Sequence, residues 1–118
     1  MRETHSIMID IYLSESANYP NLYNIVLECY NKIEEKYDDL PELVLVDTFR
    51  DMMYCGKCEN HTDGTVIYIN FNNIDSEEEL IDTIIHELLH SCYSCRNELS
   101  NHHKGEWLSR ALMFGICT

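Results

Sequence analysis

The feature that most limits the possible folds of this chain is a segment that begins at Ser76 and continues toward Cys95. Apolar residues recur in it three and four positions apart, which is the spacing of one face of an α-helix. Ser76 and Glu79 have the spacing of an N-terminal capping box, and acidic residues in a first turn are favoured by the helix dipole. We therefore predict a strong amphipathic helix whose apolar half is formed by Leu80, Ile81, Ile84, Ile85, Leu88 and Leu89.

The other segments predict a small α+β domain around this helix, with an N-terminal helix, a short three- to four-stranded sheet and a C-terminal helix. With 118 residues, of which 45% are hydrophobic, the chain can bury one modest core, so we predict a single domain over residues 1–118. The segment 65–71 alternates as a strand does and is predicted to form a hairpin with 50–55, connected by the turn segment CGKCENHTDG, which ends in Asp63-Gly64. The remaining predicted elements are an extended segment at 6–13, a helix at 20–37, a strand at 43–46 and a helix at 106–114 closed by Gly115.

The charge of the chain narrows the classes of partner. Eight basic and 21 acidic residues give a formal net charge of -13, which repels phosphate backbones and anionic membranes. Direct binding of nucleic acid is therefore not expected. No apolar run approaches the roughly 20 residues that span a bilayer, and residues 1–10 lack the pattern of an export signal. We expect a cytoplasmic protein without a membrane segment.

The predicted helix also carries a metal-binding pattern, His86-Glu87-Leu88-Leu89-His90. Two histidines four residues apart lie about 40° from each other around a helix, so both imidazoles can reach one ion. Zinc accepts imidazole nitrogens in a tetrahedral arrangement, and a carboxylate next to the first histidine can contact water at the ion. Because both histidines are predicted to lie off the apolar half, we interpret His86 and His90 as zinc ligands and Glu87 as a general base.

A catalytic zinc usually has three protein ligands, so a further donor is expected where the chain returns over the helix. His102 and His103 are the obvious candidates, and Glu98 or Glu106 are less favoured alternatives. Trp107 belongs to an apolar stripe of the last helix, and we predict that it packs against the metal-binding helix.

These motifs resemble the SprT-like zinc metallopeptidases. In that family the helix motif is followed by a loop, a third histidine and, four residues on, an aromatic residue; His103 and Trp107 match this spacing. A Gly-Lys-Cys turn, the strand sequence VIYIN and the lead-in IDTIIHELLH are also similar, so the likeness covers roughly residues 40–114. Lys104 stands where the family commonly has glycine, which leaves the choice between His102 and His103 open.

The resemblance implies a zincin-like fold and a zinc metallopeptidase acting on polypeptides. Its ligands would be His86, His90 and His103, and Glu87 would take a proton from the attacking water. Peptidases of this type often bind an extended peptide along an edge strand, and the stretch 65–71 is the expected strand. Two alternatives remain: a non-catalytic zinc-binding interaction module, and an acidic protein that imitates DNA. The sequence does not indicate the oligomeric state.

Two Cys-x-x-C pairs, Cys55/Cys58 and Cys92/Cys95, raise the possibility of a second, structural zinc site with four thiolates. The first pair is expected in a turn. If the metal-binding helix continues past His90, however, Cys92 and Cys95 point toward its apolar half, where cysteine behaves as a small buried hydrophobe. The second interpretation is favoured.

Overall fold

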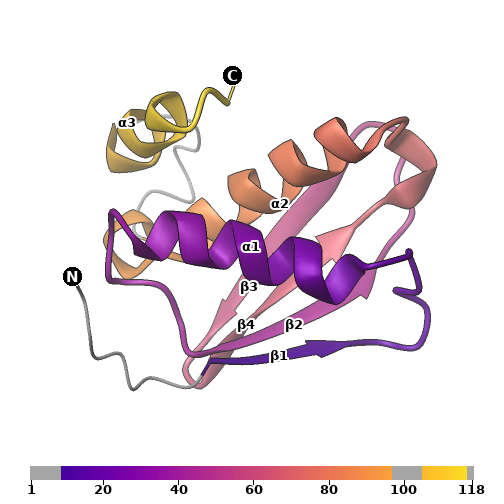
Figure 1. Ribbon diagram of the computed structural model, residues 1–118, viewed down its shortest axis with the longest axis horizontal. Coiled ribbons are helices and arrows are strands. Elements are labelled where there is room, and N and C mark those ends of the chain that lie inside the picture. The colour runs from indigo at the N-terminus through magenta and orange to yellow at the C-terminus, as the bar shows by residue number, and fades with distance from the viewer. Residues whose placement is uncertain (1–8, 97–104, 117–118) are drawn as a thin grey trace.

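The helical and alternating segments assemble into an α+β domain, seen in the computed structural model of the chain (Figure 1). The structure describes residues 9–96 and 105–116, and within them it has three α-helices and a four-stranded mixed sheet. In chain order the elements are β1 (Asp10–Leu13), α1 (Leu22–Glu34), β2 (Leu43–Thr48), β3 (Gly56–His61), β4 (Gly64–Ile69), a 3-10 turn η1 (Phe71–Asn73), α2 (Glu77–Ser91) and α3 (Gly105–Met113).

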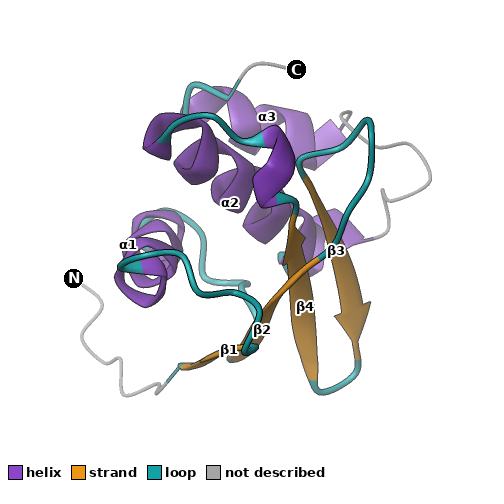
Figure 2. Ribbon diagram, turned by 90° about the vertical axis from the view of Figure 1, so that its right-hand side faces the viewer, coloured by secondary structure: helices purple, strands orange, loops and turns teal. Residues whose placement is uncertain are grey.

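The sheet has the order β1-β2-β4-β3, in which β1, β2 and β4 run parallel and β3 pairs antiparallel with β4. Helices α1 and α2 both lie on one side of it (Figure 2). On that side Val44, Val46, Ile67 and Ile69 are fully buried, because alternate residues of a strand point to the same face. The opposite face is more exposed and includes Tyr12 and Leu45. The core therefore lies between the sheet and the two helices.

Helix α2 begins as its sequence predicts. The Ser76 hydroxyl accepts a hydrogen bond from the Glu79 backbone N–H at 3.2 Å, and the Glu79 carboxylate accepts one from the Asp75 N–H at 2.8 Å. This reciprocal arrangement differs from an ideal capping box only in that the carboxylate reaches one residue further back. An N-cap of this kind stabilises a helix by about 1 kcal/mol.

The predicted hairpin is correct in its second strand but wrong in its first strand, and most of the segment 55–64 predicted as the turn is strand. The segment 50–55 is a loop, and the strand that pairs with β4 is Gly56–His61. The error arose because β3 is an edge strand whose residues do not alternate between apolar and polar. Its outward side chains are Lys57, Glu59 and His61, whereas the inward positions hold glycine, cysteine and asparagine.

The same topology corrects the expected peptide-binding strand. Residues of the stretch 65–71 form β4, which lies between β2 and β3 and has both edges paired. A further strand cannot be added to it. Among the residues that the structure describes, the edge strand beside α2 is β3, which is paired on one side only.

Helix α2 ends at Ser91, earlier than the sequence predicts. Cys92 leaves the helical conformation with ψ of 137°, and the backbone N–H groups of Tyr93 and Ser94 bond to the carbonyl and the carboxylate of Asp39, each at 2.9 Å. These bonds replace those that another helical turn would make. Helix α3 ends as predicted: Gly115 has φ of 72°, and the Ile116 N–H returns to the Ala111 carbonyl.

Within the described ranges 9–96 and 105–116, no helix is both long enough and apolar enough to cross a bilayer.

Candidate metal centre

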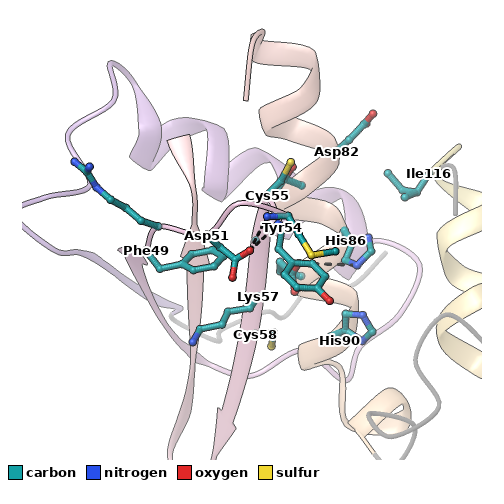
Figure 3. Close-up of a pocket in the computed structure, with 15 residues that line it drawn as sticks. Phe49, Asp51, Tyr54, Cys55, Lys57, Cys58, Asp82, His86, His90 and Ile116 are labelled. Atoms are coloured by element: carbon teal, nitrogen blue, oxygen red, sulfur yellow. Dashed lines mark hydrogen bonds and ion pairs between the residues drawn. The ribbon is translucent and has the colours of Figure 1, made fainter. Parts of the chain in front are cut away.

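Three side chains of α2 form a cluster with the composition of a metal site. One donor atom from each of His86, Glu87 and His90 can be chosen so that all lie within 4.8 Å of one another. The imidazole centroids of the two histidines are 5.1 Å apart, and His86 Nε2 lies 3.9 Å from Glu87 Oε2. Figure 3 shows His86 and His90 one above the other along the helix, facing the same cavity. The helical repeat thus brings the predicted residues together.

The cluster is more deeply buried than the sequence predicts. The side chain of His86 is 24% exposed and that of Glu87 only 7%, and His90 as a whole residue is 4% exposed. Both histidines line the cavity, as a position off the apolar half of the helix predicts, but His90 is nonetheless buried. His90 is buried because α3 packs against α2 and covers its ring.

Trp107 is the residue of α3 that makes this contact. Its ring stacks on His90, with centroids 4.8 Å apart and planes inclined by 12°, and it meets the His86 ring edge-on at 4.8 Å. Its Nε1–H donates to the His86 carbonyl oxygen at 3.2 Å. The predicted packing of Trp107 on the helix is confirmed, and the contact is made with the two imidazoles themselves. Trp107 therefore restricts the orientation of both rings.

Strand β3 lies along the other side of the cluster and is held there by Asn60. The Asn60 Nδ2 donates to the His90 carbonyl oxygen at 3.1 Å, and Asn60 Oδ1 accepts from the Thr65 hydroxyl at 2.9 Å. Since Thr65 is a buried residue of β4, the end of α2 is tied to the sheet at two strands.

Glu87 approaches the beginning of β3 at a glycine. A Cβ added to Gly56 would lie 2.8 Å from Thr83 Cγ2, 3.1 Å from Glu87 Oε2 and 3.1 Å from the Tyr68 carbonyl oxygen. Contacts below 3.0 Å force neighbouring atoms to shift. Gly56 is thus required for the close approach of β3 to the helix face that carries Glu87.

Replacement of Gly56 by alanine is accordingly expected to destabilise the protein by about 1–3 kcal/mol, the usual cost of overpacking. Denaturant unfolding of native and Gly56→Ala chains measures this directly. Adding Thr83→Ser, which removes the clashing Cγ2, should recover part of the loss. A Gly56→Ala chain within about 0.5 kcal/mol of the native stability would show that the strand is not tightly packed here.

Burial also controls the protonation of Glu87. Desolvation disfavours the charged carboxylate and raises its pKa from the ordinary 4.5 to about 8. Without a cation nearby, the carboxyl group therefore holds its proton at neutral pH. A divalent cation beside it would favour the ionised form and lower the pKa again.

This raised pKa predicts how the stability of the metal-free protein depends on pH. The folded chain retains the Glu87 proton between about pH 4.5 and 8, where the unfolded chain has released it, so the stability contributed by this proton is full below pH 4.5, falls as pH rises from there and is gone above pH 8. We expect about 3 kcal/mol of pH-dependent stability between pH 5 and 8 to disappear in Glu87→Gln. Chemical unfolding of metal-free native, Glu87→Gln and control Glu77→Gln chains tests this. Parallel curves for native and Glu87→Gln would contradict it.

The third predicted ligand, His103, and its alternatives His102 and Glu98 lie outside the described residues. Glu106, the remaining alternative, begins α3 and accepts a hydrogen bond from Arg110 Nε at 2.8 Å. It does not belong to the cluster.

The four cysteines of the predicted second site do not form a comparable cluster among the described residues. A zinc knuckle would place Cys58 in a turn, but Cys58 lies within strand β3. Cys92 and Cys95 are fully buried in the core, as the favoured interpretation predicts. Burial raises the pKa of the Cys58 and Cys92 thiols well above the usual range, which favours the protonated thiols over the thiolates that bind zinc.

The cluster opens into a cavity of about 940 Å³, within the range of ligand-binding pockets. One wall is the loop 49–55 between β2 and β3, including Met53 and Tyr54, and another is α2 with Asp82 and Thr83. Sequence reasoning missed the loop because its apolar run resembles a strand. The signal that could have identified it is Asp51, a residue that commonly begins turns.

A scan against protein-family models and searches of curated proteins and of solved structures found no match for this chain.

Proposed function

We propose that this protein is a zinc-dependent metallopeptidase with a zincin-like fold, similar to the SprT-like family, that hydrolyses polypeptides. The observation that carries the proposal is the cluster of His86, Glu87 and His90, whose donor atoms lie within 4.8 Å of one another at the edge of a cavity. Two imidazoles on consecutive turns of a helix, with a carboxylate directly after the first of them, are the residues of an HExxH zinc site, in which the imidazoles bind the ion and the carboxylate contacts its water.

The residues present fit zinc. Imidazole nitrogen is a preferred zinc ligand at about 2.0–2.1 Å, and a ring nitrogen of each histidine lies within 4.8 Å of the other. His86 and His90 would be two ligands, and His103 is proposed as the third. Bound there, zinc would polarise a peptide carbonyl and lower the pKa of water to about 7.

Glu87 would act as the general base and then as the acid. It would take a proton from the attacking water as the new C–O bond forms, and would then deliver that proton to the amide nitrogen, so that the C–N bond breaks and the amine leaves. Its burial supports this role, because a carboxylate whose pKa is raised by its surroundings is a stronger base once it is ionised. Trp107 would hold the two imidazoles in place and exclude water from behind them.

The polypeptide would bind as an additional strand on the free edge of β3. This strand lies beside α2, and Asn60 ties it to the carbonyl of His90. Main-chain hydrogen bonds to an edge strand recognise an extended peptide without regard to most of its sequence.

The proposal is tested by removing and returning the metal. The zinc-loaded chain is expected to cleave a fluorescently labelled unfolded protein, a chelator should abolish cleavage, and added zinc should restore it. Persistence of cleavage after chelation would contradict a metallopeptidase. A zinc-loaded chain with no cleavage would instead favour the non-catalytic zinc-binding module. Salt-sensitive binding to a nucleic-acid-binding protein that survives replacement of His86 and His90 would favour the DNA mimic.

A further inference from the structure

The loop between β2 and β3 exposes three consecutive large side chains beside the metal cluster. Met52 is 95% exposed, Met53 77% and Tyr54 60%. Met53 and Tyr54 line the same cavity as His86 and Glu87. Figure 3 shows Tyr54 projecting from the loop toward the side of the cavity occupied by the histidines. We call Met53 and Tyr54 the apolar lip of the site.

The backbone of this loop is anchored by side-chain hydrogen bonds although its own side chains are exposed. The Asp51 carboxylate accepts hydrogen bonds from the N–H groups of Met53 at 2.7 Å and Tyr54 at 3.2 Å. The side-chain amide of Asn70 donates to the carbonyl oxygens of Asp51 at 2.7 Å and Tyr54 at 3.0 Å. Asn73 donates to the same two oxygens at 3.1 and 3.2 Å. Asn70 is fully buried, so the loop is anchored from within the fold.

Such anchoring distinguishes the lip from an accidental exposed patch. A surface whose backbone is already ordered loses less conformational entropy when a ligand binds. Methionine is flexible and polarizable and adapts to differently shaped apolar groups. Phe49 and Ile116, which also line the cavity, extend its apolar wall. The lip is therefore a preformed surface for an apolar side chain.

The lip lies close to the place where the peptide bond would be cleaved. Gly56, the first residue of β3, lies beside the Glu87 carboxylate, since a Cβ there would be 3.1 Å from Oε2. Tyr54 is two residues before Gly56 and Met53 three. Because an extended chain advances about 3.3 Å per residue, a peptide paired with β3 would place a side chain one or two residues from the reacting bond against the lip.

We infer that the substrates are unfolded polypeptide segments cleaved within two residues of a large apolar side chain, such as leucine, methionine or phenylalanine, which Met53 and Tyr54 bind. This inference rests on the proposed function. Folded proteins bury most such side chains, so the requirement would confine cleavage to segments that are exposed by unfolding.

Two measurements test the inference, one of which does not require turnover. In the first, the zinc-loaded native chain is given a library of quenched fluorescent peptides that vary one position at a time. In the second, binding of labelled, uncleaved peptides to zinc-loaded Glu87→Gln is followed by fluorescence anisotropy. We expect leucine or phenylalanine at one position near the cleaved bond to be favoured over alanine and aspartate by at least about tenfold in both measurements.

The double variant Met53→Ser with Tyr54→Ser should reduce this preference to less than about threefold without changing the zinc content. The matched control is Leu112→Ser with Met113→Ser, which removes two exposed apolar side chains of α3 that do not line the cavity. Cleavage with no apolar preference, or a preference that survives in the lip variant, overturns the inference while the proposed function stands. If peptide binding shows an apolar preference that depends on the lip but the native chain cleaves no peptide, the inferred ligand is supported and the proposed function is contradicted.

Discussion

Replacement of Glu87 by glutamine is expected to lower the rate of peptide hydrolysis by about a hundredfold to ten-thousandfold, the usual contribution of a general base. Glutamine has nearly the same shape as the buried carboxyl group but cannot accept the proton of water. Since Glu87 is not proposed as a ligand, the zinc content of the variant should equal that of the native chain. Steady-state hydrolysis of an unfolded protein, with zinc measured on the same samples, gives both quantities.

Asp82→Asn is the matched control for this substitution. Asp82 lies on the same helix and lines the same cavity, but Figure 3 shows its carboxylate directed away from the histidines. Its replacement should leave the rate within about threefold of native. If Glu87→Gln retained a native rate, or if Asp82→Asn were equally damaging, Glu87 would not be the base.

Replacement of His90 by phenylalanine is expected to reduce bound zinc from about one ion per chain to near zero and to abolish hydrolysis with it. Phenylalanine retains a planar ring that can stack on Trp107, whereas alanine would leave a cavity in a buried position. Loss of the metal in His90→Phe is therefore separable from loss of the fold, which circular dichroism would monitor. Metal analysis after gel filtration in zinc-free buffer measures the expected change.

His61→Phe provides the comparison, because His61 is an exposed histidine of β3 that bonds to Glu59 and lies outside the cluster. That variant should retain its zinc. Equal retention of zinc by His90→Phe and the native chain would contradict the proposed ligand set.

Local pattern was sufficient to predict the parts of the site that lie on one helix. The capping residues Ser76 and Glu79 determine where α2 begins, and the interval between His86 and His90 places both rings on neighbouring turns of the same face. The N-terminal helix, the C-terminal helix and the strand 64–69 were likewise predictable, because their hydrophobic periodicity agrees with the face that each buries.

The parts that sequence did not predict depend on contacts between distant segments. Strand β3 forms because β4 pairs with it, and its polar residues give no alternating signal of their own. His90 is buried by Trp107, which is 17 positions further along the chain. The loop that carries Met53 and Tyr54 is ordered by the side chain of Asn70, whose partners are 16 and 19 positions earlier. Periodicity within one segment contains no information about such pairings.

The site depends both on the local pattern of one helix and on contacts between distant segments. Helix α2 carries the proposed ligands and base, His86, Glu87 and His90, whereas α3, β3 and the loop 49–55 provide burial, a sheet edge and an apolar wall. Preorganisation of this kind is what positions a reacting group in a hydrolase. The proposed peptidase activity therefore depends on the tertiary packing as much as on the motif.

The central claim is that one zinc ion binds between His86 and His90, and anomalous X-ray scattering from crystals of the zinc-loaded protein tests it most directly. Data collected on either side of the zinc absorption edge should show a single strong peak at about 2.0–2.1 Å from a ring nitrogen of each histidine, with Glu87 close by but not bound to the ion. A peak at the cysteines, or no peak near the two imidazoles in zinc-saturated crystals, would contradict the claim.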